Sequence, residues 1–156
     1  MTLKTKSSAE IGKKFVEDVI SKIPNTVNVI KEYTSSRNKF DLILTFPRKN
    51  GGGKVIKGNT SQAKKLIEKA ESIVILECSK VGKFKDIKGN FGEILKIPAL
   101  TENKKIKSFY LVHEEIENPK YSVYLEELCR HWLKPVFKVE LIELKDIANK
   151  IANLWN

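Results

Sequence analysis

Glu77 is the first residue whose position calls for a chemical explanation. It follows the aliphatic run 73–76 in the segment IVILECSK (73–80), where a carboxylate, a thiol, a hydroxyl and an ammonium end a predicted buried strand. A charge beside the protein interior is costly unless it is paired, hydrated or bound to a metal. Glu77, with Ser79 and Lys80 after it, is therefore a candidate for a functional site.

Asp41 is the second candidate, because it opens the predicted strand FDLILTF (40–46) although Asp is a poor strand former. If 40–46 and 72–79 are antiparallel neighbours, the start of one lies beside the end of the other, and Asp41 lies against Glu77. Two carboxylates so placed repel each other unless a cation is near. Mg²⁺ suits this pair, since it takes one or two carboxylates, a backbone carbonyl such as that of Cys78, several waters and then a substrate phosphate.

A metal held in this way activates a water and neutralises the charge that develops on a scissile phosphodiester. A nearby lysine adds a further cation. The pattern Asp41, Glu77, Ser79 and Lys80 thus predicts phosphodiester hydrolysis with Mg²⁺, or with Mn²⁺ as a substitute.

With these residues the chain resembles the PD-(D/E)xK nuclease superfamily, which includes type II restriction enzymes and archaeal Holliday-junction resolvases. The likeness covers residues 8–144 in the order of elements and implies a restriction-endonuclease-like αβββαβ core. In that family an Asp opens the second strand and an E-x-K motif ends the third, and Asp41 and Glu77 match the metal-binding acids. Some members add a Glu from the first helix, and Glu10 stands at that position.

The chain departs from the family pattern at two places. Phe40 stands where Pro often precedes the Asp, and Lys80 makes the motif E-x-x-K. Side-chain alternation puts Glu77 and Ser79 on one face of the strand and Lys80 on the other. Either a bulge after Glu77 turns Lys80 back, or Ser79 holds the family's lysine position and a lysine of the following turn supplies the charge, the candidates being Lys83 and Lys85.

The segment RKNGGGKVIKGNT (48–60) contains four glycines and four basic residues, and its composition predicts a mobile basic loop. Its GGGK run lacks the spacing of a phosphate-binding P-loop. A clamp on backbone phosphates is one interpretation and a solvated loop is the other. The candidate nucleic-acid-binding residues are Arg48, Lys49, Lys54 and Lys57, with Lys83 and Lys85 from the next basic turn.

Structural roles compete with each of these interpretations. Asp41 can cap a turn, Lys80 can be a solvated strand end, and Glu10 completes a capping box with Ser7. Cys78, opposite Glu77, is typical of a small core residue. Structural or surface roles are expected for His113 and His131, and core or interface roles for Trp132 and Trp155.

Hydrophobic periodicity predicts a mixed α/β domain, with a central sheet flanked by helices. The expected helices span 8–23, 61–71, 91–98, 121–133 and 146–155. The expected strands span 26–34, 40–46, 72–79, 107–115 and 137–144. Ser61 is the expected cap of the second helix, and the fourth is expected to bear Tyr124, Leu125, Leu128 and Trp132.

The 156 residues suit one domain, residues 1–156, and the formal net charge of +10 makes nucleic acid the leading partner class. A Lys-rich genome or a hot habitat is the alternative source of the charge. Two cysteines in no metal-ligand pattern indicate reduced thiols, and the lack of a membrane span or signal peptide predicts a cytoplasmic protein.

Three functions from different classes fit these observations. The first is a Mg²⁺-dependent DNA endonuclease that acts as a homodimer, because two strands need two active sites. The second is a non-catalytic, basic nucleic-acid-binding module. The third is a doubly wound α/β protein that binds a nucleotide or a protein partner, which requires parallel rather than antiparallel pairing of 40–46 with 72–79.

Overall fold

The computed structural model describes residues 7–35, 38–46, 52–82, 89, 91–92, 94, 106–133 and 138–154. Its strands are β1 (Asn28–Ser35), β2 (Asn38–Thr45), β3 (Val55–Lys57), β4 (Ile73–Cys78), β5 (Val81–Gly82), β6 (Ile106–His113), β7 (Glu115–Ile116) and β8 (Lys138–Glu143). Its helices are α1 (Ser8–Lys22), α2 (Ser61–Lys69), α4 (Pro119–Leu133) and α5 (Ile147–Leu154), with a 3-10 turn, η5, at Leu144–Asp146. None of the helices described is long and apolar enough to cross a membrane.

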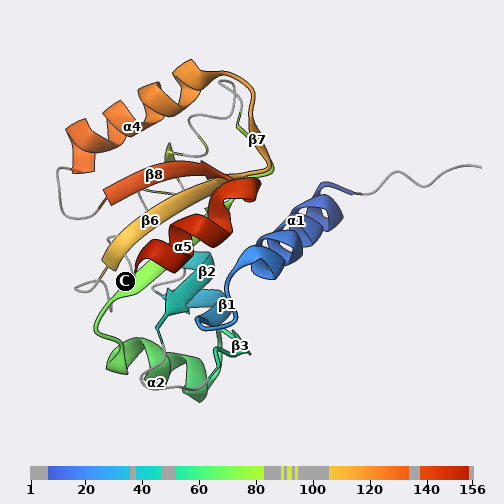
Figure 1. The fold of residues 1–156 in the computed structure, drawn as a ribbon, viewed down its shortest axis with the longest axis vertical. Coiled ribbons are helices and arrows are strands. Elements are labelled where there is room, and N and C mark those ends of the chain that lie inside the picture. The colour runs from blue at the N-terminus through green and yellow to red at the C-terminus, as the bar shows by residue number, and fades with distance from the viewer. Residues whose placement is uncertain are drawn as a thin grey trace, which may run out of the picture.

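A mixed six-stranded sheet forms the centre of the α/β fold, in the order β3-β1-β2-β4-β6-β8 (Figure 1). The strand β2 runs antiparallel to both β1 and β4, whereas β3 pairs parallel with β1, and β4, β6 and β8 are mutually parallel. The short strands β5 and β7 form a separate parallel pair. The α/β fold class is confirmed, and the antiparallel pairing of β2 with β4 excludes the doubly wound alternative.

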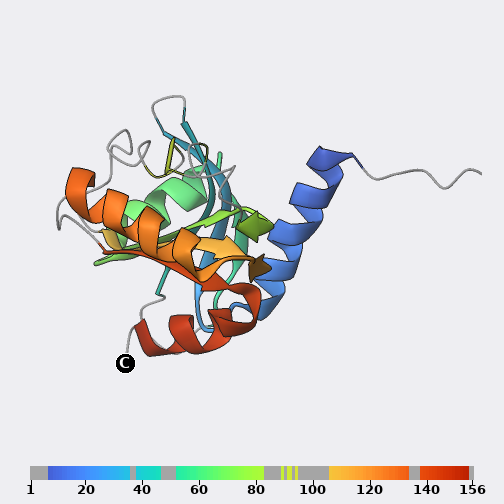
Figure 2. The ribbon, with the colours of Figure 1, turned by 90° about the horizontal axis from the view of Figure 1, so that it is seen from above.

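Helices cover both faces of the sheet, which gives three layers (Figure 2). Alternation along the strands sends one set of side chains to each face. On one face, α1 and α5 bury Phe15, Val19, Ile147 and Ile151 against strand residues that include Leu42, Leu44, Val74 and Leu76. On the other face, α2 and α4 bury Ala63, Ile67, Tyr121, Leu125 and Cys129 against residues that include Ile43, Ile75 and Phe109.

The helix ends follow local capping chemistry. The Ser7 hydroxyl accepts a hydrogen bond from the Glu10 N–H at 3.2 Å, and α1 ends at Lys22, before Pro24, as predicted. For α2 the predicted cap is wrong by one residue. Thr60, which has extended backbone angles, accepts from the Ala63 N–H, while Ser61 is already the first helical residue.

The described part of the predicted loop 48–60 contains the strand β3 and is not a mobile loop. Its glycines permit close docking against β1, because a Cβ on Gly53 would lie 1.9 Å from the Val27 carbonyl oxygen. The Lys54 N–H donates to Asn28 Oδ1 at 2.9 Å, and the Lys54 carbonyl accepts from the Val29 N–H. Gly53 and Gly58 therefore serve backbone packing, a role that composition alone does not distinguish from flexibility.

The helix α4 packs through a different face from the one predicted. Tyr121, Leu125 and Cys129 are buried, whereas Tyr124 is 53% and Trp132 67% exposed. Trp132 is therefore not a core residue, and Trp155 lies outside the described residues. The predicted helix 91–98 also lies mostly outside them, although Phe91 and Ile94 are helical and Ile94 is fully buried. Asp146 belongs to the 3-10 turn that precedes α5.

Candidate functional site

Asp41 and Glu77 lie side by side where the β2–β4 pairing ends, as the antiparallel arrangement predicts. The last aligned pair is Leu42 with Leu76, so the next residues along each strand are Asp41 and Glu77. The Glu77 Oε1 accepts a hydrogen bond from the Asp41 N–H at 3.2 Å. The Asp41 Oδ2 accepts from the Cys78 N–H at 2.9 Å.

These reciprocal bonds give the two carboxylates a structural role. Each carboxylate accepts from a backbone N–H of the opposite strand, at the point where the regular ladder stops. Hydrogen bonds to a charged acceptor are stronger than those between neutral groups, and they offset part of the repulsion between neighbouring carboxylates. The pair is therefore held in place by the sheet itself.

The two acids nevertheless face different layers. Leu76 packs under α1 and Ile75 under α2 and α4, so strand alternation directs Cys78 toward α1 and Glu77 to the opposite side. Glu77 is 3% exposed. Cys78 is half-buried and lines a pocket with Asp41, and Glu77 is not part of that pocket wall.

A local irregularity in β1 and β2 explains why Asp41 reaches this pocket. The β1–β2 ladder is in register on both sides of Glu32 and Asp41, but these two residues are not paired, and Glu32 has a φ of 56°. Phe40 packs with the α2 and α4 layer, whereas Leu42, two residues later, packs with α1 and α5. The break in alternation at position 41 directs Asp41 toward α1, as bulges near functional sites often do.

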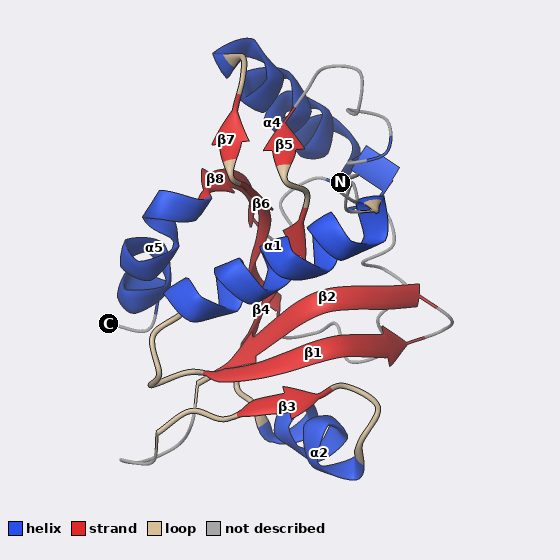
Figure 3. Cartoon of the chain, turned by 90° about the vertical axis from the view of Figure 1, so that its right-hand side faces the viewer, coloured by secondary structure: helices blue, strands red, loops and turns tan. Residues whose placement is uncertain are grey.

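The pocket lies between α1 and the β1–β2–β3 side of the sheet and has a volume of about 720 Å³. In Figure 3, α1 passes in front of β4 and β6 and runs alongside β2, with β1 and then β3 beyond β2. The wall residues from α1 are Ala9, Gly12, Lys13, Val16 and Glu17. Those from the strands and the turn before α2 are Lys31, Glu32, Lys39, Asp41, Lys57, Gly58, Asn59, Thr60 and Cys78.

The other predicted site residues are distributed around this pair. The Lys80 Nζ lies 3.7 Å from a Glu114 carboxylate oxygen, and both side chains are about half exposed. The Ser79 backbone is held by β6, because its N–H donates to the Val112 carbonyl and its own carbonyl contacts His113 Nδ1 at 2.5 Å. Glu10 lies in the first turn of α1 and is exposed, outside the pocket wall.

Of the two predicted phosphate-binding lysines that the structure describes, Lys57 lines the pocket and Lys54 does not. Lys54 lies just before β3. Arg48, Lys49, Lys83 and Lys85 lie outside the described residues, so their proposed roles stay predictions.

Glu17, Lys13 and Lys31 are pocket residues that sequence reasoning missed. Lys13 and Glu17 are four residues apart on α1 and share the face of Ala9 and Val16. The small residues Ala9 and Gly12 on this face were the available signal, because they leave room beside the sheet. The charge of Lys31 within the otherwise β-rich segment 26–34 was a second signal.

The surroundings of Cys78, His113 and His131 indicate structural roles for these three side chains. Burial, and secondly the charges of Asp41 and Glu77, raise the pKa of the Cys78 thiol well above its ordinary value of 9.0, so the thiol stays protonated at neutral pH. A protonated thiol is neither a nucleophile nor a good metal ligand. His113 is fully buried and packs edge-on against Tyr121, and His131 packs edge-on against Trp132.

Within the described residues, no group of three or more Asp, Glu, His and Cys side chains is arranged to hold a metal ion. Comparison with protein-family models, curated proteins and solved structures gave no match for this chain. The chemistry of the site therefore has to be inferred from the Asp41–Glu77 pair and the pocket beside it.

Proposed function

We propose that this protein is a metal-dependent DNA endonuclease. The observation that carries the proposal is the juxtaposition of Asp41 and Glu77, 36 residues apart in the chain, at one end of the β2–β4 ladder. The order α1, β1, β2, β4 and the parallel strand β6 supports the resemblance to the αβββαβ core of PD-(D/E)xK nucleases. The net charge of +10 favours a polyanionic substrate.

The carboxylate and carbonyl oxygens at this strand end are the type of donor that a hard divalent cation prefers. Mg²⁺ needs only one or two carboxylates from a protein, with carbonyls and waters as its remaining ligands. Asp41 and Glu77 are adjacent, and Asp41 forms no ion pair within the described chain. We propose that they hold Mg²⁺, or Mn²⁺ in its place, with the carbonyl of Cys78; the metal would neutralise charge on the phosphodiester and lower the pKa of a bound water.

The remaining roles belong to the chain's own groups. The backbone N–H groups of Asp41 and Cys78 hold the two carboxylates at the strand end, and binding one metal ion through both would require one side chain to turn, because Asp41 lines the pocket and Glu77 does not. Lys80, or Lys83 or Lys85 after it, supplies the auxiliary cation, and Ser79 keeps the strand end paired with β6. We further propose a homodimer, which can cut both strands, acting in the cytoplasm with reduced thiols.

A second candidate function is non-catalytic binding of nucleic acid. Both carboxylates already accept backbone hydrogen bonds, and Glu77 faces away from the pocket, which favours a purely structural pair. On this alternative, binding depends steeply on salt and is indifferent to EDTA.

A cleavage assay separates the two candidates. Wild-type protein is incubated with supercoiled plasmid or a synthetic four-way junction, in Mg²⁺, Mn²⁺ or EDTA, alongside Asp41→Asn and Glu77→Gln. The amide oxygens of Asn and Gln still accept the backbone N–H bonds, so the strand end is preserved while the charge is removed. We expect metal-dependent cuts by wild type and a loss of roughly 100-fold or more in both variants.

Glu68→Gln is the matched control, because Glu68 is exposed on α2 and forms no ion pair within the described residues. It should cut as wild type does. A preference for the junction would indicate resolution and a preference for linear sites restriction. If wild type cuts no DNA with either metal yet binds it in a salt-sensitive manner, the nuclease proposal is wrong and the binding module stands.

A further inference from the structure

Two lysines of like charge lie directly opposite each other on β1 and β3. Lys31 and Lys57 are aligned in the parallel ladder, at its last pair. Like charges opposite each other on neighbouring strands destabilise a sheet. Among the described residues neither lysine forms an ion pair that would offset this repulsion. The arrangement is therefore more stable when an anion lies between them.

Both lysines line the pocket under α1, and a third cation joins them there. Lys13 comes from α1 and likewise forms no ion pair within the described chain. Of the acids in the wall, Glu32 is paired with Lys39 at 3.5 Å. Three lysines that form no ion pair with the described residues thus share the pocket lining with Glu17 and Asp41, so the lining keeps an excess of positive charge.

The size and lining of the pocket limit what it can hold. Its volume of about 720 Å³ falls in the range of about 300–1,000 Å³ that is typical of small-molecule sites. Ala9, Gly12 and Val16 of α1 give the pocket an apolar part beside Lys13, and Asn59 and Thr60 add polar groups to its lining. A single nucleotide matches this space and lining, and a length of duplex does not.

We propose that this pocket binds one phosphorylated nucleotide unit, with its phosphate on Lys31 and Lys57 and its less polar part against α1. The nucleotide is either free or at the end of a nucleic-acid strand, because the phosphate chemistry is the same in both. The choice of a nucleic-acid strand end rests on the proposed function, whereas binding of the phosphate does not.

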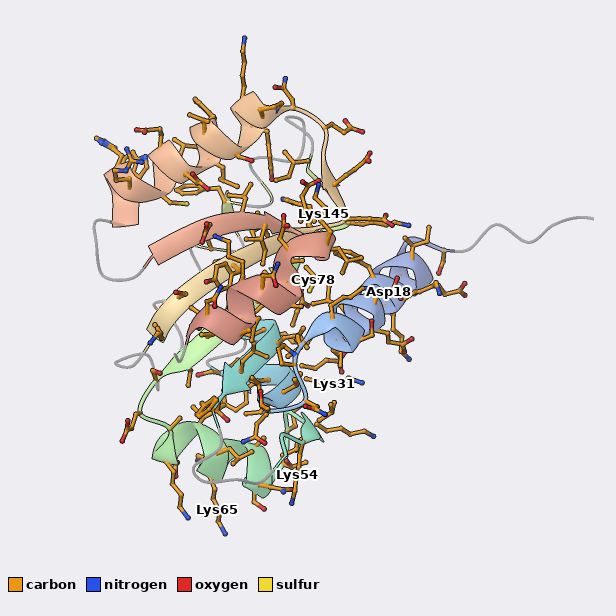
Figure 4. The ribbon with its side chains drawn as sticks, viewed as in Figure 1. Asp18, Lys31, Lys54, Lys65, Cys78 and Lys145 are labelled. Carbon is orange, nitrogen blue, oxygen red and sulfur yellow. The ribbon has the colours of Figure 1, made fainter. Side chains whose placement is uncertain are left out.

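The test is calorimetric titration in EDTA with thymidine 5′-monophosphate, with a 5′-phosphorylated oligothymidylate, and with the same oligonucleotide lacking the phosphate. We expect wild type to bind both phosphorylated probes, and Lys57→Ala to lose about tenfold or more in affinity for them. Lys65→Ala is the matched control, because Lys65 is exposed on α2 and lies away from Lys31 and Cys78 (Figure 4). It should keep wild-type affinity.

Gly12→Leu should occupy part of the pocket while the folded protein remains stable. A Cβ on Gly12 meets no atom within 4 Å, and Gly12 lines the pocket, so a larger side chain can extend into the pocket space. Leu is also a better helix former than Gly, so α1 should become more stable. We expect Gly12→Leu to melt no lower than wild type and to lose binding of both phosphorylated probes.

The proposal is wrong if wild type binds neither phosphorylated probe, or if Gly12→Leu and Lys57→Ala bind them as wild type does. Stronger binding of the phosphorylated oligonucleotide than of the mononucleotide would identify a strand end as the ligand, and equal binding a free nucleotide. Because EDTA removes the metal ion that cleavage needs, these titrations test the binding proposal independently of the nuclease proposal.

Discussion

Glu32 holds a backbone conformation that few non-glycine residues adopt. Its φ of 56° lies in the left-handed region, and it occurs in the middle of β1, opposite Asp41. A side chain in this region costs about 1–2 kcal/mol relative to ordinary backbone angles. The chain therefore tolerates strain at the residue that interrupts the ladder beside the candidate site.

We predict that Glu32→Gly raises the free energy of unfolding by up to about 1 kcal/mol, because glycine adopts this φ without a steric cost. Glu32→Val should lower it by about 1–2 kcal/mol, since a β-branched residue is poorly tolerated there. Urea denaturation of both variants measures the difference. Both lose the exposed Glu32–Lys39 pair, which contributes little, so the comparison isolates the backbone term. Equal stability of the two variants would contradict the assigned conformation.

Cys129 predicts a pH dependence of stability. Burial, and then the charge of Glu126, raise the pKa of its thiol from 9.0 to about 11. The unfolded thiol ionises near pH 9 while the native one stays protonated, so the unfolded state releases its proton first and stability falls as the pH rises from 9 to 11. Cys129→Ala should be less stable at pH 7 but show a shallower fall over this range in denaturant titrations. Parallel curves for the two proteins would contradict this.

At the scale of elements, β3 depends on two glycines that let it dock against β1. A Cβ on Gly53 would lie 1.9 Å from the Val27 carbonyl oxygen, and one on Gly58 would lie 2.5 Å from the Lys31 carbonyl oxygen. These are backbone atoms, of β1 at Lys31 and of the residue just before β1 at Val27, and they cannot move aside without disturbing the β1–β3 ladder. The pocket wall that carries Lys57 therefore depends on glycine at positions 53 and 58.

We predict that Gly53→Ala and Gly58→Ala each lower the free energy of unfolding by about 2 kcal/mol or more. Hydrogen exchange should show loss of protection at the Val29 N–H, which donates to the Lys54 carbonyl. Gly12→Ala is the matched control, because the same added methyl group enters open space within a helix. It should raise stability by about 0.5–1 kcal/mol. Wild-type protection in Gly53→Ala would contradict the docking described.

The sequence was sufficient for the longer helices and strands and for one long-range contact, but not for the short strands β3, β5 and β7. Apolar alternation located the main strands, and the antiparallel pairing of 40–46 with 72–79 brought Asp41 beside Glu77. The side of the sheet that Asp41 faces could not be predicted, because it depends on the irregularity at Glu32. The orientation of α4 was also missed, since Tyr124 and Tyr121 both fit a helical apolar pattern and only packing distinguishes them.

For the whole molecule, the net charge of +10 predicts salt-sensitive binding to nucleic acid. We expect the logarithm of the binding constant to fall linearly with the logarithm of salt concentration. Replacing both Lys31 and Lys57 by Ala should reduce the slope by roughly 1, because the one phosphate contact that the two lysines share is lost. Fluorescence anisotropy with a labelled oligonucleotide measures this. The control is the double replacement of Lys64 and Lys65 by Ala, since both lysines are exposed on α2. If this control reduced the slope of the salt dependence equally, the effect would come from net charge alone and not from the pocket.

The three-layer arrangement allows local opening on the two sides of the sheet to be measured separately. Cys78 packs with the layer under α1 and α5, and Cys129 with the layer under α2 and α4, so each side of the sheet carries one thiol. Thiol labelling followed by mass spectrometry therefore reports the opening of each side separately, without any engineered probe. A ligand in the pocket should slow labelling of Cys78, which lines it, and leave Cys129 unchanged.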